Sequence, residues 1–163
     1  MSPKVERSIY IVVIAILAVY LLILGKKQIE LQKNIPITAE ELYKKLSNPK
    51  LKVQVVDVRE LTSSDEVGGY EDSRIPGSLP FPNCDESKMT TENLQEALKR
   101  INPYAYTVIV STDGNPEIFK KCAEKFSNAQ NLAGGMGSWQ EAGLPDESGE
   151  YTPPKAGGGG GCL

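Results

Sequence analysis

The stretch VIVSTDGNPEIFKKC, from Val108 to Cys122, decides the fold, because an apolar strand in it leads through a short polar loop directly into a helix. Many enzymes hold an anion or a reactive cysteine in this way, since the first helical turn offers free backbone N–H groups. The loop here contains neither a cysteine nor a basic residue; it consists of Thr112, Asp113, Gly114, Asn115, Pro116 and Glu117.

Strands and helices alternate on both sides of this unit. The sequence predicts helices in IPITAEELYKKL (35–46), TTENLQEALKRI (90–101), NPEIFKKCAEKF (115–126) and MGSWQEAG (136–143), and strands in LKVQVVDV (51–58), TVIVS (107–111) and AQNLAGG (129–135). Thr38 and Glu41 have the spacing of a capping box at the start of the first helix. Near-continuous apolar strands that alternate with helices predict an α/β domain with a parallel sheet covered on both faces.

Residues 8–25, SIYIVVIAILAVYLLILG, predict a single transmembrane helix. No charged residue lies between Ile9 and Leu24, and a helix of that length spans about 24 Å, near the short limit for a bilayer. The apolar run is longer than that of most signal peptides, and Gly25-Lys26-Lys27 is a poor cleavage site. We therefore divide the chain into an N-terminal tail (1–7), the transmembrane helix (8–25), a connector (26–35), an α/β domain (36–146) and a Pro/Gly-rich tail (147–163).

Composition removes several classes of function. The net charge is −3, which does not suit a nucleic-acid-binding protein. The chain has no histidine, so Ser-His and Cys-His nucleophile pairs and histidine metal ligands are excluded. The three cysteines have no CxxC spacing, and we expect no metal site and no cofactor; one disulfide pair could still form.

Four separated motifs resemble the rhodanese-like domain family. Asp57 and Arg59 match the family's Asp-x-Arg at a strand end. Ile75, Pro76 and Gly77 match a His-Ile-Pro-Gly turn, with Arg74 in place of His, and a closing element is matched by Gly134, Gly135, Trp139, Gly143 and Pro145. The resemblance covers about two thirds of the chain. It implies a three-layer fold with a central parallel sheet of about five strands, and in active members a loop cysteine that carries a persulfide in sulfur transfer.

The resemblance places the family's catalytic cysteine at Thr112, or at Ser111 if the alignment slips by one residue. A hydroxyl cannot carry a persulfide. Asp113 and Glu117 would also oppose an incoming anion such as thiosulfate. By contrast, Asn115 suits a helix N-cap, Pro116 the first helical position and Glu117 the first turn. The loop is therefore interpreted as a helix start, and the chain as a rhodanese-like protein without the activity.

The remaining candidates have structural interpretations. We expect Asp57 and Arg59 to pair at a strand end, Trp139 to anchor the core or a lid, and the Gly134-Gly135 pair to form a turn. Cys122 suggests a small buried residue, and acidic neighbours should raise the pKa of Cys84 on its loop. Cys84 and Cys162 are the alternative thiols for sulfur chemistry.

A membrane anchor on an inactive enzyme fold predicts an accessory or docking subunit of a membrane protein complex, whose partners are integral membrane subunits and the lipid bilayer. Lysines on both sides of the anchor give only a slight preference for a cytoplasmic domain. Two alternatives stay open at this point: a membrane-tethered sulfurtransferase or persulfide carrier that uses a non-standard cysteine, and a non-catalytic sensor of a small ligand.

Overall fold

The computed structural model describes residues 12–23 and 35–154, which fall into two units that divide after Ile35. Residues 12–23 form a helix inside the predicted transmembrane segment 8–25, and the ends of that segment lie outside the described residues. Within the described ranges, no helix combines the length and the apolar character needed to cross a membrane.

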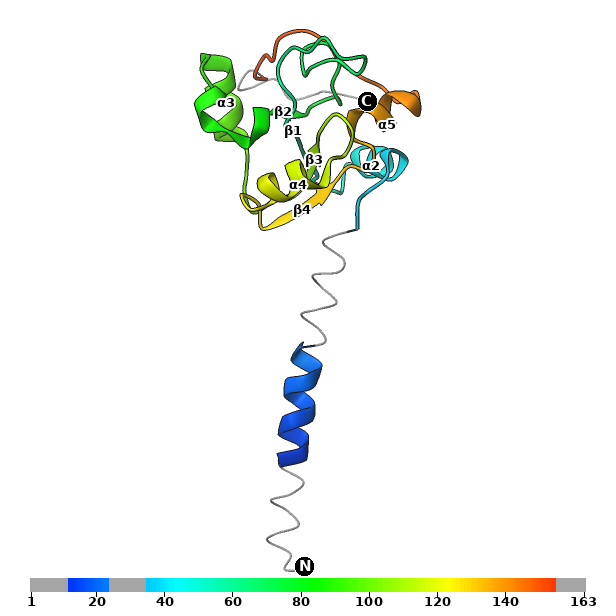
Figure 1. The fold of residues 1–163 in the computed structure, drawn as a ribbon, viewed down its shortest axis with the longest axis vertical. Coiled ribbons are helices and arrows are strands. Elements are labelled where there is room, and N and C mark those ends of the chain that lie inside the picture. Colours follow the sequence, from blue (N-terminus) through cyan, green and yellow to red (C-terminus); the bar gives the residue numbers. More distant parts are fainter. Residues whose placement is uncertain (1–11, 24–34, 155–163) are drawn as a thin grey trace, which may run out of the picture. The chain divides into compact units, whose positions relative to one another are not determined.

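The second unit is built on a parallel sheet of four strands (Figure 1). The strands are β1 (Gln54–Asp57), β2 (Leu79–Pro80), β3 (Tyr106–Val110) and β4 (Asn128–Asn131), in the order β2-β1-β3-β4. The expected number of about five strands is wrong. A single parallel bridge joins Ile37 to Leu132 beside β4, and the pairing stops there because Thr38 already caps the next helix.

Helices cover both faces of the sheet. On one face lie α2 (Ala39–Leu46) and α5 (Gly135–Glu141), and on the other lie α3 (Glu92–Arg100) and α4 (Pro116–Ala123), as Figure 1 shows. Two short 3₁₀ turns, η1 (Pro82–Cys84) and η2 (Glu86–Lys88), connect β2 to α3. No local pattern in the sequence predicts either turn or the two-residue strand β2.

The strands alternate their buried side chains between the two faces, as a doubly covered sheet requires. In β3, Val108 and Val110 pack with α2 and α5, whereas Ile109 packs with α3 and α4. All three are fully buried. The predicted α/β class with a covered parallel sheet is therefore confirmed.

Local signals in the sequence set the starts of three helices. The Thr38 hydroxyl accepts a hydrogen bond from Glu41 N–H at 3.3 Å, and the Thr91 hydroxyl accepts one from Leu94 N–H at 3.3 Å. Asn115 caps α4 in the same way. The predicted N-caps at Thr38 and Asn115 are confirmed, and Thr91 is a third that was not predicted. Each removes an unpaired backbone donor from a helix end.

Candidate functional site

The polar loop Ser111–Asn115 joins β3 to α4 at the edge of the sheet where the parallel strands end. Ligands of open α/β sheets bind outside this edge, so the loop is the first place to look for chemistry. Ser111 is the first residue after β3 and is buried, whereas Thr112 is half-buried and Asp113 exposed. Gly114 follows Ser111 by three residues, which fits the family's Cys-x-x-Gly spacing and favours Ser111 over Thr112 as the first loop position.

Side chains of the loop accept hydrogen bonds from the loop's own backbone. Ser111 Oγ accepts from Gly114 N–H at 3.0 Å, and Asp113 Oδ1 accepts from Asn115 N–H at 3.0 Å. Asn115 Oδ1 accepts from the N–H groups of Glu117 at 2.8 Å and Ile118 at 3.3 Å. Those N–H groups are the donors with which a helix N-terminus would hold an anion. Side chains of the loop therefore accept from four backbone N–H groups at the start of α4, those of Gly114, Asn115, Glu117 and Ile118.

The other side of the loop packs directly on the Gly134-Gly135 turn. A Cβ atom on Gly135 would lie 2.6 Å from Gly114 N, and one on Gly114 would lie 2.7 Å from Gly134 N. The first turn of α5 donates to the loop, from Met136 N–H to Ser111 O at 2.8 Å and from Gly137 N–H to Thr112 O at 3.0 Å. The two glycines thus form a turn, as expected, and a side chain at either position would separate the two backbones.

Asn131 lies beside the loop at the end of β4. Its Nδ2 donates to Gly114 O at 2.6 Å, while its Oδ1 is buried without a hydrogen-bond partner. This residue carried no signal in the sequence, because it lies in β4, 17 positions along the chain from the loop residue that it contacts. Its amide orients the carbonyl of Gly114 and so helps to fix the loop.

Asp57 and Arg59 form a buried ion pair at the end of β1, as expected. Arg59 Nη2 lies 2.7 Å from Asp57 Oδ2, and the side chains are 2% and 0% exposed. Arg59 also donates to Gly68 O and Ser73 O, which ties the following segment to the strand. Burial raises the pKa of Asp57, and the hydrogen bonds and charge of Arg59 act against that shift. The pair therefore has a structural role, because it holds the segment after β1 against the end of that strand.

Arg74 stands at the family's histidine position and holds the segment after α5. None of its described hydrogen bonds or ion pairs reaches the loop Ser111–Asn115. Its backbone pairs in both directions with Glu147, and its guanidinium donates to Gly149 O. The guanidinium also lies 4.8 Å from the centre of the Tyr70 ring. Pro76 and Gly77 follow in a turn, in which Gly77 has a φ of +74°.

Trp139 is a core residue, as expected. It is 1% exposed, and its indole N–H donates to Pro145 O at 2.9 Å. This contact folds the segment after α5 back on the helix.

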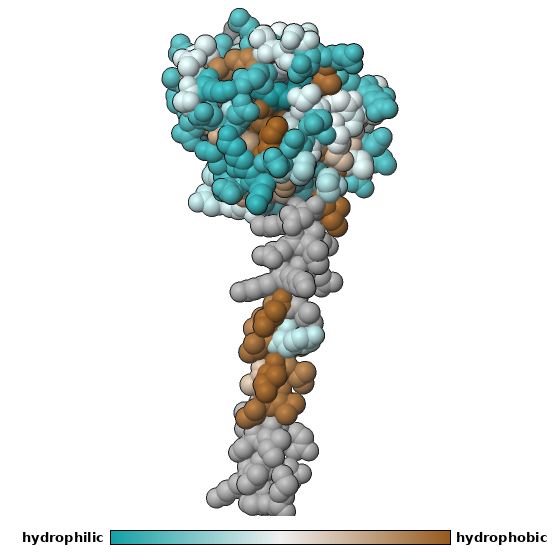
Figure 2. Space-filling view, in the orientation of Figure 1, coloured by the Kyte–Doolittle hydropathy of each residue, from teal (hydrophilic) through white to brown (hydrophobic). Residues whose placement is uncertain are grey.

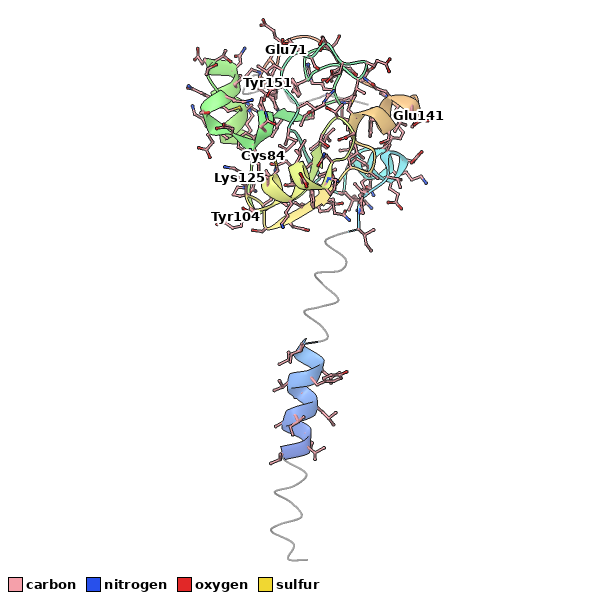
Figure 3. The ribbon with its side chains drawn as sticks, viewed as in Figure 1. Glu71, Cys84, Tyr104, Lys125, Glu141 and Tyr151 are labelled. Atoms are coloured by element: carbon pink, nitrogen blue, oxygen red, sulfur yellow. A yellow bond between two sulfur atoms is a disulfide. The ribbon has the colours of Figure 1, made fainter. Side chains whose placement is uncertain are left out.

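Cys84 and Cys122 form a disulfide, with their Cα atoms 5.5 Å apart. Both residues are buried, at 3% and 0% exposure, and Figure 3 shows Cys84 beside α4. The expected loop thiol at Cys84 is therefore wrong, since its sulfur is already bonded and does not titrate. The third cysteine, Cys162, lies outside the described residues.

Two cavities among the described residues lie away from the loop, which lines neither of them. One of about 620 Å³ lies between the start of β1 and the segment 147–154 and is lined in part by Arg74, Arg100 and Tyr151. The other, of about 520 Å³, lies beside Tyr43, Pro76 and Trp139. Among the residues that the structure describes, no cluster of three or more metal-ligating side chains occurs.

Comparison with known proteins agrees with this geometry. The model of the rhodanese-like domain matches residues 38–142. A protein from Bacillus halodurans superposes with a TM-score of 0.54 at 18% identity, over 76% of this chain and 84% of that one.

The rhodanese-like domain of an Anabaena protein gives a TM-score of 0.52 at 19% identity, over 78% of this chain and 91% of that one. A Lactobacillus plantarum protein gives 0.51 at 22% identity, over 76% and 98%. At these identities the similarity shows the fold alone. No curated protein that was compared with the chain matches it.

Proposed function

The chain belongs to the rhodanese-like domain family, and from that premise we propose that it is a non-catalytic member, attached to a membrane by its N-terminal apolar segment, that serves as a docking subunit of a membrane protein complex. The observation that carries the proposal is the loop Ser111–Asn115. It offers a hydroxyl where sulfur transfer needs a thiolate, and its side chains accept from the backbone N–H groups of Gly114, Asn115 and Glu117.

The charges around the loop support the same conclusion. A persulfide and its sulfane donor are anionic, and a thiolate is stabilised by nearby cations and free N–H groups. Asp113 and Glu117 are exposed carboxylates on the loop and on the first turn of α4. Arg74 donates to Gly149 O and pairs with Glu147, so its charge does not compensate those of Asp113 and Glu117.

The disulfide supports an inactive domain and also suggests its compartment. Cys84, one of two thiols considered for sulfur chemistry, is oxidised and buried, which leaves Cys162 as the remaining candidate. Disulfides persist in oxidising compartments and are rare in the cytosol. We therefore place the domain on the oxidising side of its membrane, and this placement replaces the slight cytoplasmic preference drawn from the lysines.

The docking role is tested by isolating the protein with its neighbours. The full chain, carrying an affinity tag, is extracted from membranes in a mild detergent, and the co-migrating chains are identified by mass spectrometry. We expect integral membrane proteins to co-purify in fixed stoichiometry. A chain that leaves the membrane in salt alone, or that migrates as a monomer in detergent, contradicts the proposal.

A further inference from the structure

The charges of the α/β domain are separated between the two edges of its sheet. In a parallel sheet all strands begin at one edge and end at the other. We use the name strand-start edge for the connecting segments 47–53, 101–105 and 124–127 together with the last turns of α2 and α3. The opposite edge holds the loops that follow the strands.

Several contacts show that the segments of the strand-start edge lie together. Asn102 N–H donates to Gln54 Oε1 at 2.8 Å, which joins the start of β1 to the segment before β3. Ser127 N–H donates to Pro103 O at 2.8 Å and brings in the segment before β4. Lys45 Nζ lies 3.2 Å from the hydroxyl of Tyr106, which places the end of α2 at the start of β3.

The strand-start edge is basic, and the opposite edge is acidic. The strand-start edge carries Lys44, Lys45, Lys50, Lys52, Lys99, Arg100 and Lys125. Glu96 pairs with Lys99 and Arg100, Glu124 lies in the segment before β4, and Lys125 lies 3.7 Å from Glu86 in the loop after β2. The loops of the opposite edge carry Glu60, Asp65, Glu66, Glu71, Asp72, Asp85, Glu86 and Asp113. Of the three cations there, Arg59 and Arg74 are buried, and Lys88 pairs with Glu60.

Exposed apolar side chains also gather at the strand-start edge. Tyr104 is 82% exposed and Leu51 is 50% exposed, although most of the domain surface in view is hydrophilic (Figure 2). Figure 3 shows Tyr104 at one end of the domain and Glu71 at the other. An exposed aromatic ring among lysines is the combination found where proteins meet the headgroups of anionic lipids.

The chain enters the domain from the same side. Ile37 pairs in parallel with Leu132, just past the end of β4, so Ile35 and Pro36 precede it on the side of the strand-start edge. The connector 26–35 is ten residues long and reaches at most about 35 Å when extended. This length limits how far the domain can lie from a bilayer that holds residues 8–25.

We propose that the strand-start edge binds the anionic phospholipid surface of the membrane that holds the N-terminal segment, with Tyr104 and Leu51 at the headgroup level and the lysines against lipid phosphates. This inference rests on the membrane attachment in the proposed function. It turns the acidic edge, with the loop Ser111–Asn115, away from the lipid and leaves it open to a partner.

The test places a tryptophan at each edge of the full-length protein. Tyr104→Trp reports from the strand-start edge, and Asp65→Trp is the matched control at the acidic edge, where Asp65 is exposed. The native Trp139 is 1% exposed and gives a constant background. Each variant is reconstituted into vesicles of phosphatidylcholine, with and without phosphatidylglycerol, and the fluorescence is quenched with lipids brominated in the acyl chains.

We expect Tyr104→Trp to be quenched more in anionic vesicles, by roughly twofold, and less at high salt or after Lys50→Gln with Lys52→Gln. Asp65→Trp should show no added quenching in either vesicle. Protein that fails to float with the vesicles refutes the membrane attachment itself. Protein that floats but shows equal quenching at the two positions overturns only the orientation proposed for the domain.

Discussion

The disulfide between Cys84 and Cys122 joins the turn after β2 to helix α4, whose first turn is capped by Asn115 of the loop Ser111–Asn115. The two cysteines are separated by 38 positions, so the cross-link closes a loop that contains η2, α3 and β3. It attaches α4 to η1 at Cys122. This point lies more than one helical turn beyond the loop in which an active family member carries its cysteine.

Replacing both cysteines, Cys84→Ala with Cys122→Ala, should lower the free energy of unfolding by about 3–4 kcal/mol, because a cross-link over a loop of this length restricts the unfolded chain. Urea denaturation followed by circular dichroism measures the loss. In the unfolded, unreduced wild-type protein, one thiol should react with an alkylating reagent, and three should react after reduction. Three reactive thiols before reduction would contradict the disulfide.

Asp57→Asn should destabilise the domain by about 3–5 kcal/mol, because it leaves the Arg59 guanidinium buried without its counter-charge. Glu147→Gln is the matched control, since Glu147 is half exposed and its oxygen lies 3.7 Å from Arg74, so its loss should cost less than about 1 kcal/mol. The two variants are compared in one urea series. Equal losses of unfolding free energy in the two variants would mean that the buried Asp57–Arg59 pair stabilises the fold no more than the Arg74–Glu147 pair does.

Comparing Gly135→Ala with Gly143→Ala distinguishes the cost of close packing from the cost of placing a side chain at a positive φ. Both glycines have positive φ, +58° and +62°, but a Cβ on Gly143 meets nothing within 4 Å, whereas one on Gly135 meets the backbone of the loop. We expect Gly143→Ala to cost about 1–2 kcal/mol and Gly135→Ala about 1–3 kcal/mol more. Thermal unfolding measures both, and equal costs would show that the loop does not press on the Gly134-Gly135 turn.

The stability of the domain should depend on Asp72 at acidic pH. Its carboxylate accepts from Gly69 N–H at 2.6 Å and from Ser63 N–H at 3.3 Å, and these bonds lower the pKa of Asp72, with the Gly69 bond the larger cause. The stabilisation is complete above the ordinary aspartate pKa of about 3.9 and is lost as the pH falls through the lower folded value. The difference in unfolding free energy between wild type and Asp72→Asn should therefore be constant near neutral pH and shrink below about pH 4. A difference that grows on acidification would contradict the assignment.

Local patterns in the sequence predicted much of this fold. Thr38, Thr91 and Asn115 cap their helices by bonds to residues two or three positions away, and the apolar strands alternate with those helices along the chain. What could not be predicted depends on distant parts of the chain. The disulfide needs η1 and α4 to be neighbours, and η1 follows a strand, β2, that is only two residues long.

The candidate site likewise has features that the local sequence predicts and features that depend on residues distant along the chain. The sequence already shows that residues 111–117 contain no cysteine, and the Asp57–Arg59 pair follows from two residues on one strand end. The preference for Ser111 over Thr112 as the first loop position rests on the spacing to Gly114 and agrees with the end of β3 at Val110. The bond from Asn131 to the loop joins residues 17 positions apart, so no local pattern could reveal it.

The central claim, that this rhodanese-like domain does not transfer sulfur, is tested most directly by incubating the purified full-length protein with thiosulfate. Intact-protein mass spectrometry then detects a bound sulfur atom, and added cyanide detects its onward transfer as thiocyanate. We predict neither a persulfide that is passed on nor any thiocyanate above the level of a protein-free reaction. Thiocyanate formed in repeated turnovers, and lost when Cys162 is changed to Ser, would contradict the account.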